Sequence, residues 1–180
     1  VSTTANYNQT TSADVGVTAG AYTGICKLNY YYWPVPVQPS GNSLQQYKSG
    51  AAVYITTGNW TNENNAAIKF SMTSPAPGDL LFPVIEIKQT GVGFNGLNLS
   101  TGTAMVFNGD ALTGQVNITG LSNGTTYHWQ ACVYGNGGRS LWTSFGGNPE
   151  TGADFGADLS SPSAPSDSGR TPSDLTYSSQ

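Results

Sequence analysis

The chain has 180 residues, of which six are Lys or Arg and ten are Asp or Glu, so its formal net charge is -4. Six scattered cations exclude the basic surface that a nucleic-acid-binding protein needs, and no apolar run approaches the ~20 residues of a membrane-spanning helix. Charged residues make up 9% of the chain, against roughly 25% in ordinary soluble domains, and the hydroxyl and amide side chains that replace them are typical of secreted or packed proteins.

The first segment, residues 1–60, predicts an extension that packs on the outside of a domain or between subunits. The chain begins at Val1 without a basic and apolar leader, which we interpret as the mature form of an exported, extracellular protein. Residues 14–21 alternate as a strand does, with no obvious partner in the chain. The residues on its apolar face, a possible assembly strand, are Val15, Val17, Ala19 and Ala21.

An aromatic segment follows at residues 25–37 and contains a patch of four consecutive rings, Tyr30, Tyr31, Tyr32 and Trp33. Such rings either pack within the molecule, covering a sheet face, or form a platform on which sugar rings stack. The sequence leaves both interpretations open.

Cys26 and Cys132 are the two cysteines of the chain. An even count in an exported protein favours one disulfide, which would close a loop of about 100 residues and contribute on the order of 4 kcal/mol. Two buried free thiols are the alternative.

Frequent Gly and Pro leave no room for a long helix, and the apolar runs are short and alternate, so we expect an all-β chain. Pro83 predicts a bulge or an unpaired edge. We expect one domain at residues 61–158 and, from its Ser/Pro-rich composition, a flexible tail at 159–180. The predicted strands are 67–72, 80–88, 104–107, 115–118, 126–134 and 140–145.

Leu121 precedes Tyr127 by six residues, with a Gly-containing turn between them. This spacing resembles the tyrosine corner of fibronectin type III and related immunoglobulin-like sandwiches. The stretch TYHWQACVYGNGGRSLWTSFGGNPETGADF also resembles the closing hairpin of fibronectin type III-like modules in secreted bacterial surface proteins.

The resemblance covers residues 62–158 and implies an immunoglobulin-like (fibronectin type III-like) β-sandwich. It departs from the family at the second strand, where Phe70 stands in place of a Trp. With Tyr127 facing the core, Cys132 faces away, so a disulfide would tie Cys26 to the outside of the sandwich. The family hosts binding, adhesive and structural roles, so the fold alone does not decide the function.

Candidate catalytic and metal-binding residues are few. His128 is the single histidine, and its place between Tyr127 and Trp129 predicts a structural strand residue and no catalytic triad. Glu150, Asp154 and Asp158 could attract calcium, although their spacing fits no known loop motif. We therefore expect no enzyme, cofactor or metal site.

Five sequons could carry N-linked glycans on the surface of a secreted protein. Their asparagines are Asn8, Asn59, Asn98, Asn117 and Asn123.

The strand without a partner leads to our functional hypothesis. An extended segment that finds no partner in its own chain can add to the sheet of a neighbouring copy, and a head-to-tail contact of this kind generates a filament. We expect a structural subunit of an extracellular, pilus-like homopolymer. The alternatives are a carbohydrate-binding or adhesive surface module and an accessory domain of a larger secreted enzyme.

Overall fold

A computed structural model of the chain describes the backbone of residues 11–19 and 22–30 and all of residues 33–160. The described part is all-β, as predicted, and its two helical elements are single 3-10 turns, η1 (Gly41–Ser43) and η2 (Phe145–Gly147). Neither turn is long and apolar enough to cross a membrane.

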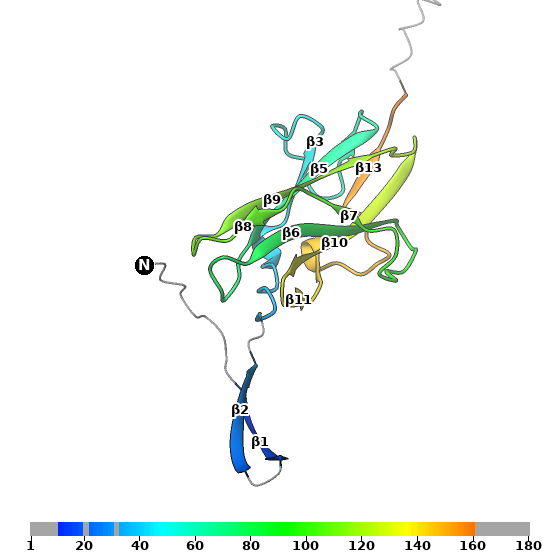
Figure 1. The fold of residues 1–180 in the computed structure, drawn as a ribbon. Coiled ribbons are helices and arrows are strands. Elements are labelled where there is room, and N and C mark those ends of the chain that lie inside the picture. Colours follow the sequence, from blue (N-terminus) through cyan, green and yellow to red (C-terminus); the bar gives the residue numbers. More distant parts are fainter. Residues whose placement is uncertain (1–10, 20–21, 31–32, 161–180) are drawn as a thin grey trace, which may run out of the picture.

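Two sheets pack face to face in the part of the chain from residue 33 onward (Figure 1). The larger sheet has the order β4-β13-β10-β6-β7, and the short strands β11 and β12 pair with β10 while β8 pairs with β6. Its strands are β4 (Trp60–Thr61), β6 (Leu80–Gln89), β7 (Ser100–Thr101), β8 (Met105–Val106), β10 (Thr125–Gly135), β11 (Gly138–Arg139), β12 (Thr143–Ser144) and β13 (Phe155–Ala157).

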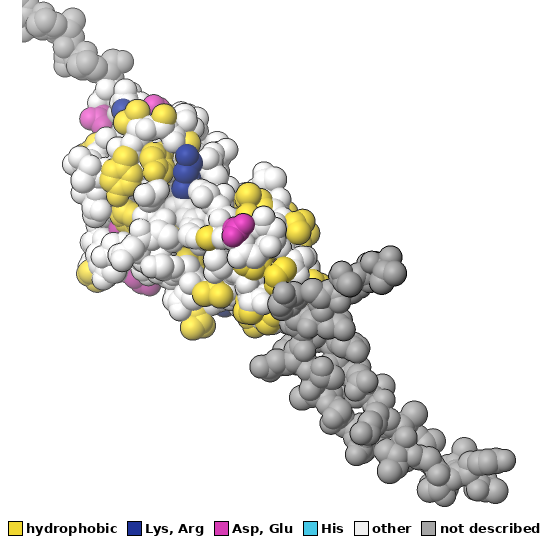
Figure 2. Space-filling model, turned by 90° about the vertical axis from the view of Figure 1, so that its left-hand side faces the viewer, with side chains coloured by type: hydrophobic (Ala, Val, Ile, Leu, Met, Phe, Trp, Pro, Cys, Tyr) yellow, Lys and Arg dark blue, Asp and Glu magenta, His cyan; other side chains and the backbone are white. Residues whose placement is uncertain are grey.

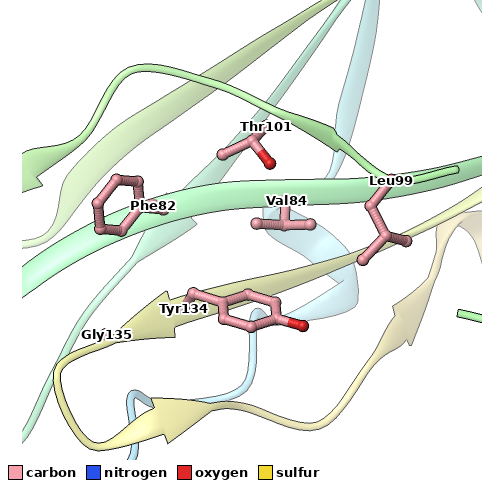
Figure 3. A pocket seen from close by; sticks show the side chains of 6 residues that line it. All are labelled: Phe82, Val84, Leu99, Thr101, Tyr134 and Gly135. Atoms are coloured by element: carbon pink, nitrogen blue, oxygen red, sulfur yellow. The ribbon is translucent and has the colours of Figure 1, made fainter. Parts of the chain in front are cut away.

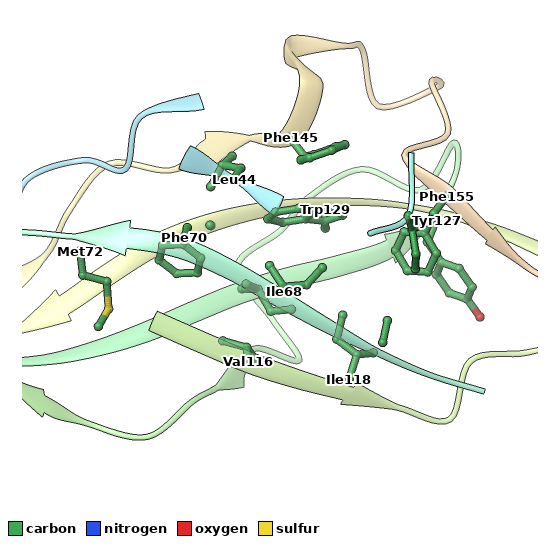
Figure 4. Packing of buried hydrophobic residues seen from close by; sticks show 14 of the residues in the cluster. Leu44, Ile68, Phe70, Met72, Val116, Ile118, Tyr127, Trp129, Phe145 and Phe155 are labelled. Carbon is green, nitrogen blue, oxygen red and sulfur yellow. The ribbon is translucent and has the colours of Figure 1, made fainter. Parts of the chain in front are cut away.

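The smaller sheet has the order β3-β5-β9, with all neighbours antiparallel. Its strands are β3 (Gln45–Lys48), β5 (Asn65–Met72) and β9 (Leu112–Thr119). The apolar rows of both sheets meet in one core, shown in Figure 4. This arrangement is a β-sandwich, and it follows from the period-two alternation of the central strands, which turns every second side chain inward.

The alternation of β10 separates core residues from the outer face of the larger sheet. Tyr127, Trp129, Ala131 and Val133 belong to the core cluster, whereas Cys132 does not. The Trp129 ring stacks on Phe145 with ring centroids 4.9 Å apart. The inner row of β10 is therefore the centre of the core.

The sandwich begins earlier than the predicted boundary at residue 61. Strand β3 pairs with β5 along its whole length, and Leu44 and Ile55 belong to the core cluster. Gln46 is wholly buried and donates hydrogen bonds to the carbonyl oxygens of Ile55 (3.1 Å) and Asp154 (2.8 Å). Residues 44–60 are part of the domain.

Pro83 neither bulges β6 nor lies on an unpaired edge, which corrects the prediction. It is in continuous register with β10, opposite Val133. The Val133 amide donates to Ser140 Oγ, and the Val133 carbonyl accepts from Ser140 N, so this pair does not use the amide that proline lacks. A non-hydrogen-bonded position of an antiparallel pair tolerates proline for this reason.

The closing edge of the sandwich differs from the single strand predicted at residues 140–145. The chain there forms only β12 and the turn η2, and the later strand β13 pairs with the start of β10. Phe145 is buried as expected, but Trp142 lies outside the core with Arg139 over its ring, 5.1 Å from the centroid.

The N-terminal segment forms a separate two-stranded sheet. Strand β1 (Thr11–Ala19) pairs with β2 (Tyr22–Tyr30) through nine residue pairs, from Thr11 opposite Tyr30 to Ala19 opposite Tyr22. The expected assembly strand therefore has a partner within its own chain, because residues 22–30 are themselves able to form a strand. Ala21 lies outside the described residues.

Candidate functional site

The outer face of the larger sheet carries an apolar pocket of about 320 Å³ (Figure 3). Strand β10 places Tyr134 directly opposite Phe82 of β6, and β7 places Thr101 opposite Val84. The residues that line it are Phe82, Val84, Leu99, Thr101, Tyr134 and Gly135.

This pocket has no charged side chain in its lining. Its floor is buried, since Val84 is 3% exposed, while Tyr134 at the rim is 36% exposed. Such a surface binds apolar side chains, because removing both partners from water is favourable and no charge is desolvated. Sequence patterns did not reveal it, since Leu99 and Thr101 come from a Gly-rich connection and a two-residue strand.

A buried polar cluster adjoins the pocket along the same face. Glu86 is wholly buried and accepts hydrogen bonds from the amides of Asn95 (2.8 Å) and Gly96 (3.0 Å) and from Gln130 Nε2 (2.8 Å). Lys88 Nζ lies 3.4 Å from its Oε1. Burial alone would raise the pKa of Glu86, but these hydrogen bonds outweigh it and hold the pKa below its usual value.

His128 belongs to the same covered region. Its Nε2 lies 2.8 Å from the carbonyl oxygen of Val92, and its ring packs on Phe94 with centroids 4.3 Å apart. A carbonyl oxygen only accepts, so Nε2 carries the proton. The side chain is 2% exposed, and these contacts fix the connection at residues 90–99 on the sheet.

The predicted disulfide is not formed. Cys132 is a free, wholly buried thiol, and burial raises its pKa to about 12. Disulfide formation needs an accessible thiolate, which burial suppresses. In the backbone register of the hairpin, Cys26 lies opposite Val15.

The connection at residues 90–99 covers the polar cluster on the outer face, and the packing of the aromatic segment stays a prediction. Tyr30 ends β2, and Tyr31 and Tyr32 lie outside the described residues. Trp33 is 40% exposed, and the chain after it passes over the turn between β10 and β11. A Cβ at Gly137 would lie 2.2 Å from the Trp33 carbonyl oxygen.

The Tyr127 side chain is hydrogen-bonded to the turn that precedes β10. Its ring is 8% exposed, Leu121 is 5% exposed, and the Ser122 amide donates to the Tyr127 hydroxyl at 2.8 Å. This is the geometry of a tyrosine corner, which fixes the approach to β10.

The three acidic residues considered for calcium have separate partners and surroundings. Glu150 accepts from the Phe94 amide, Asp154 is buried between Trp129 N and Asn148 Nδ2, and Asp158 is exposed. Residues 11–19, 22–30 and 33–160 hold no group of three or more His, Cys, Asp or Glu placed to bind a metal ion.

Four of the sequon asparagines, Asn59, Asn98, Asn117 and Asn123, lie exposed on the domain, while Asn8 is outside the described residues. Asn123 Oδ1 accepts from the Leu159 amide and Asn117 Oδ1 accepts from Gln115 Nε2, which leaves the nitrogen of each amide available. Glycosylation at these positions stays a prediction.

Comparisons with known proteins give no relative. No protein-family model matches the chain, and no curated protein or solved structure matches it.

Proposed function

We propose that this chain is a structural subunit of an extracellular, self-assembling filament, in which the β1–β2 hairpin of one copy docks on the next copy. The observation that carries the proposal is the hairpin itself. Its two strands pair with each other and with no other strand of the described residues. An isolated two-stranded hairpin is marginally stable in water, so this one needs a further partner.

The register gives the hairpin one apolar side. Residues directly opposite each other share a side, so Ala13 and Leu28 fall on the same side as Val15 and Cys26. Asp14 pairs with Lys27 on the other side. By sequence and register, one side of the hairpin is mainly apolar and the other is polar apart from Ile25, and such a sheet is stabilised when an apolar surface covers its apolar side.

We assign the receiving surface to the apolar pocket on the outer face of the larger sheet. It is the complementary kind of surface, being uncharged and lined by Phe82, Leu99 and Tyr134. The hairpin and the pocket are different surfaces, so the contact is head-to-tail, and such a contact continues from copy to copy instead of closing.

Surface composition supports an assembled, secreted role. The face shown in Figure 2 carries few charged side chains, and hydrophobic side chains gather on it in several groups. The tyrosine corner and the two packed sheets support a fibronectin type III-like module of a cell-surface protein. Low charge reduces the repulsion that keeps ordinary soluble proteins apart.

A truncation tests the proposal. Purified full-length chain should form filaments visible by negative-stain electron microscopy, whereas residues 33–180 should remain monomeric by light scattering. Filaments formed by residues 33–180 would rule out the hairpin as the connecting element.

A matched pair of substitutions tests the receiving surface. Leu99→Asp places a charge in the pocket and should prevent assembly, whereas Leu141→Asp, at a residue that is 72% exposed and outside the pocket, should not. Equal assembly of the two variants would exclude the pocket.

A further inference from the structure

A second pocket, of about 420 Å³, lies beside the edge strand β4. Strand β3 contributes Lys48, β4 contributes Trp60, and the chain after β13 contributes Asp158 and Ser160. Its volume falls within the ~300–1,000 Å³ of typical small-molecule sites. The complete lining is Lys48, Trp60, Thr61, Asn62, Asp158 and Ser160.

One face of the Trp60 ring is packed, and the residue also lines the second pocket. It is 50% exposed, and a Cβ on Gly156 would lie 2.4, 2.5 and 2.7 Å from three atoms of its six-membered ring. Three nearly equal distances mean that Gly156 meets the flat face of the indole. Gly156 is not among the glycines of positive φ, so the close approach of the ring explains the absence of a side chain there.

The backbone holds this ring in place. Gly156 lies opposite Trp60 in the parallel pairing of β13 with β4, and its amide donates to the Asn59 carbonyl at 3.0 Å. The Asp158 amide donates to the Thr61 carbonyl at 2.8 Å. The site therefore stands on paired strands, which makes it largely preformed.

The polar groups around the ring offer both donors and acceptors. Lys48 Nζ donates to Asn62 Oδ1 at 2.7 Å. Asp158 Oδ1 accepts from the Ser160 amide at 3.1 Å and from the Ser160 hydroxyl. One cation and one anion leave the pocket without net charge, so an ionic ligand of either sign would meet one like charge.

An exposed indole face ringed by such groups has the chemistry that a sugar requires. The C–H face of a pyranose is apolar and covers an aromatic ring, while its hydroxyl groups both donate and accept hydrogen bonds at the rim. We propose that this pocket binds a neutral sugar residue of a polysaccharide, stacked on the open face of Trp60. The site is independent of the hairpin and of the assembly described above.

Binding of neutral oligosaccharides to the full-length chain tests the site. Cellohexaose, laminarihexaose and mannohexaose would be titrated by calorimetry and tryptophan fluorescence, with an oligogalacturonate as the charged comparison. At least one neutral oligomer should bind more tightly than the charged one. Failure of all three neutral oligomers to bind at millimolar concentration would overturn the proposal.

Two tryptophans provide the matched variants. Trp60→Ala should weaken binding by roughly tenfold or more, because the stacked ring is the anchor of the site. Trp33→Ala removes a ring of similar exposure, 40%, outside the pocket and should leave affinity unchanged. Equal loss in both variants, or loss only in Trp33→Ala, would contradict the assignment and favour the aromatic segment at residues 30–33.

A variant at a polar rim residue distinguishes loss of binding from loss of folding stability. Asn62→Ala removes an exposed amide at the rim and should weaken binding severalfold while thermal unfolding stays unchanged. An Asn62→Ala variant with full affinity, together with a Trp60→Ala variant that melts early, would show that Trp60 serves packing alone.

Discussion

Trp129 Nε1 donates a hydrogen bond to Gln46 Oε1 at 2.9 Å across the interior of the sandwich. Both residues are wholly buried, and they connect β10 of the larger sheet with β3 of the smaller one. A buried indole N–H requires an acceptor, and this one comes from a segment that the sequence assigned to an extension.

Gln46→Ala should destabilise the domain strongly. The substitution leaves Trp129 Nε1 and the carbonyl oxygens of Ile55 and Asp154 without this partner, at on the order of 1–3 kcal/mol for each buried group that stays unsatisfied. Gln45→Ala, at the exposed neighbouring position, should change stability by less than about 0.5 kcal/mol. Urea unfolding followed by tryptophan fluorescence measures both, and similar values for the two would contradict the buried network.

Because Gln46 bonds Trp129 from β3, the smallest fragment that folds should include β3. A chain of residues 33–160 retains β3 and should unfold cooperatively, whereas residues 61–160 lack Gln46, Leu44 and Ile55 and should not. Circular dichroism melting and proton NMR dispersion distinguish the two. A well-folded 61–160 fragment would show that β3 is dispensable.

Tyr127→Phe should cost about 1–2 kcal/mol, because the Ser122 amide loses its acceptor while the ring still packs. Tyr134→Phe on the same strand is the matched control, since Tyr134 is 36% exposed, and it should be nearly neutral. Denaturant midpoints measure the difference, and a neutral Tyr127→Phe would mean that water replaces the hydroxyl.

The Cys132 thiol should be unreactive in the native protein. Burial and a pKa raised to about 12 leave almost no thiolate at pH 8. A thiol reagent should therefore modify Cys132 only after denaturation, without prior reduction. If denatured protein reacts at Cys132 only after a reductant is added, a disulfide is present and the free thiol is wrong.

The free energy of unfolding should first rise and then fall as the pH is lowered from 7 to 3. Burial raises the pKa of Asp154 to about 6, against the hydrogen bonds from Asn148 and Trp129 that lower it. The folded state then holds a proton more tightly than the unfolded chain, so Asp154 adds stability as pH falls from about 6 to about 4. Glu86, whose pKa is lowered, contributes stability above about pH 4 that is lost as pH falls further.

Urea unfolding between pH 3 and pH 7 measures both the rise due to Asp154 and the loss due to Glu86. Asp154→Asn should remove the gain between pH 6 and pH 4 and keep the loss below pH 4. A carbon-detected NMR titration of the Asp154 carboxyl gives a direct value, and an ordinary midpoint near 4 would contradict the raised pKa.

The central strands could be predicted because the pattern of apolar residues within each strand is enough to identify it. Alternation located β5, β9 and β10 within a few residues, and a run that is apolar on both faces located β6. Alternation also placed Trp129 inside and Cys132 outside the core. An all-β fold with two packed sheets follows from those strands.

The remaining elements depend on partners distant in the chain. Strand β3 reads Gln-Gln-Tyr-Lys and carries no apolar signal. Gln46 is inside because its amide group bonds Trp129 and the carbonyl oxygens of Ile55 and Asp154. Trp60 lies in a two-residue strand, and its role is visible only once Gly156, 96 positions later, is seen beneath the ring. The cover over Glu86 comes from a Gly-rich connection that has no periodicity.

The hairpin lies within residues 11–30, and the apolar pocket is built from residues 82–135. In the filament that we propose, a copy that lacks residues 1–32 could receive a neighbour's hairpin in its pocket but could not dock on another copy. Mixed in small amounts with full-length chain, it would cap the end that presents a free hairpin and leave the end that presents a free pocket open. A filament that grows at its hairpin end would then become shorter as the fraction of truncated chain rises, whereas one that grows at its pocket end would keep its length.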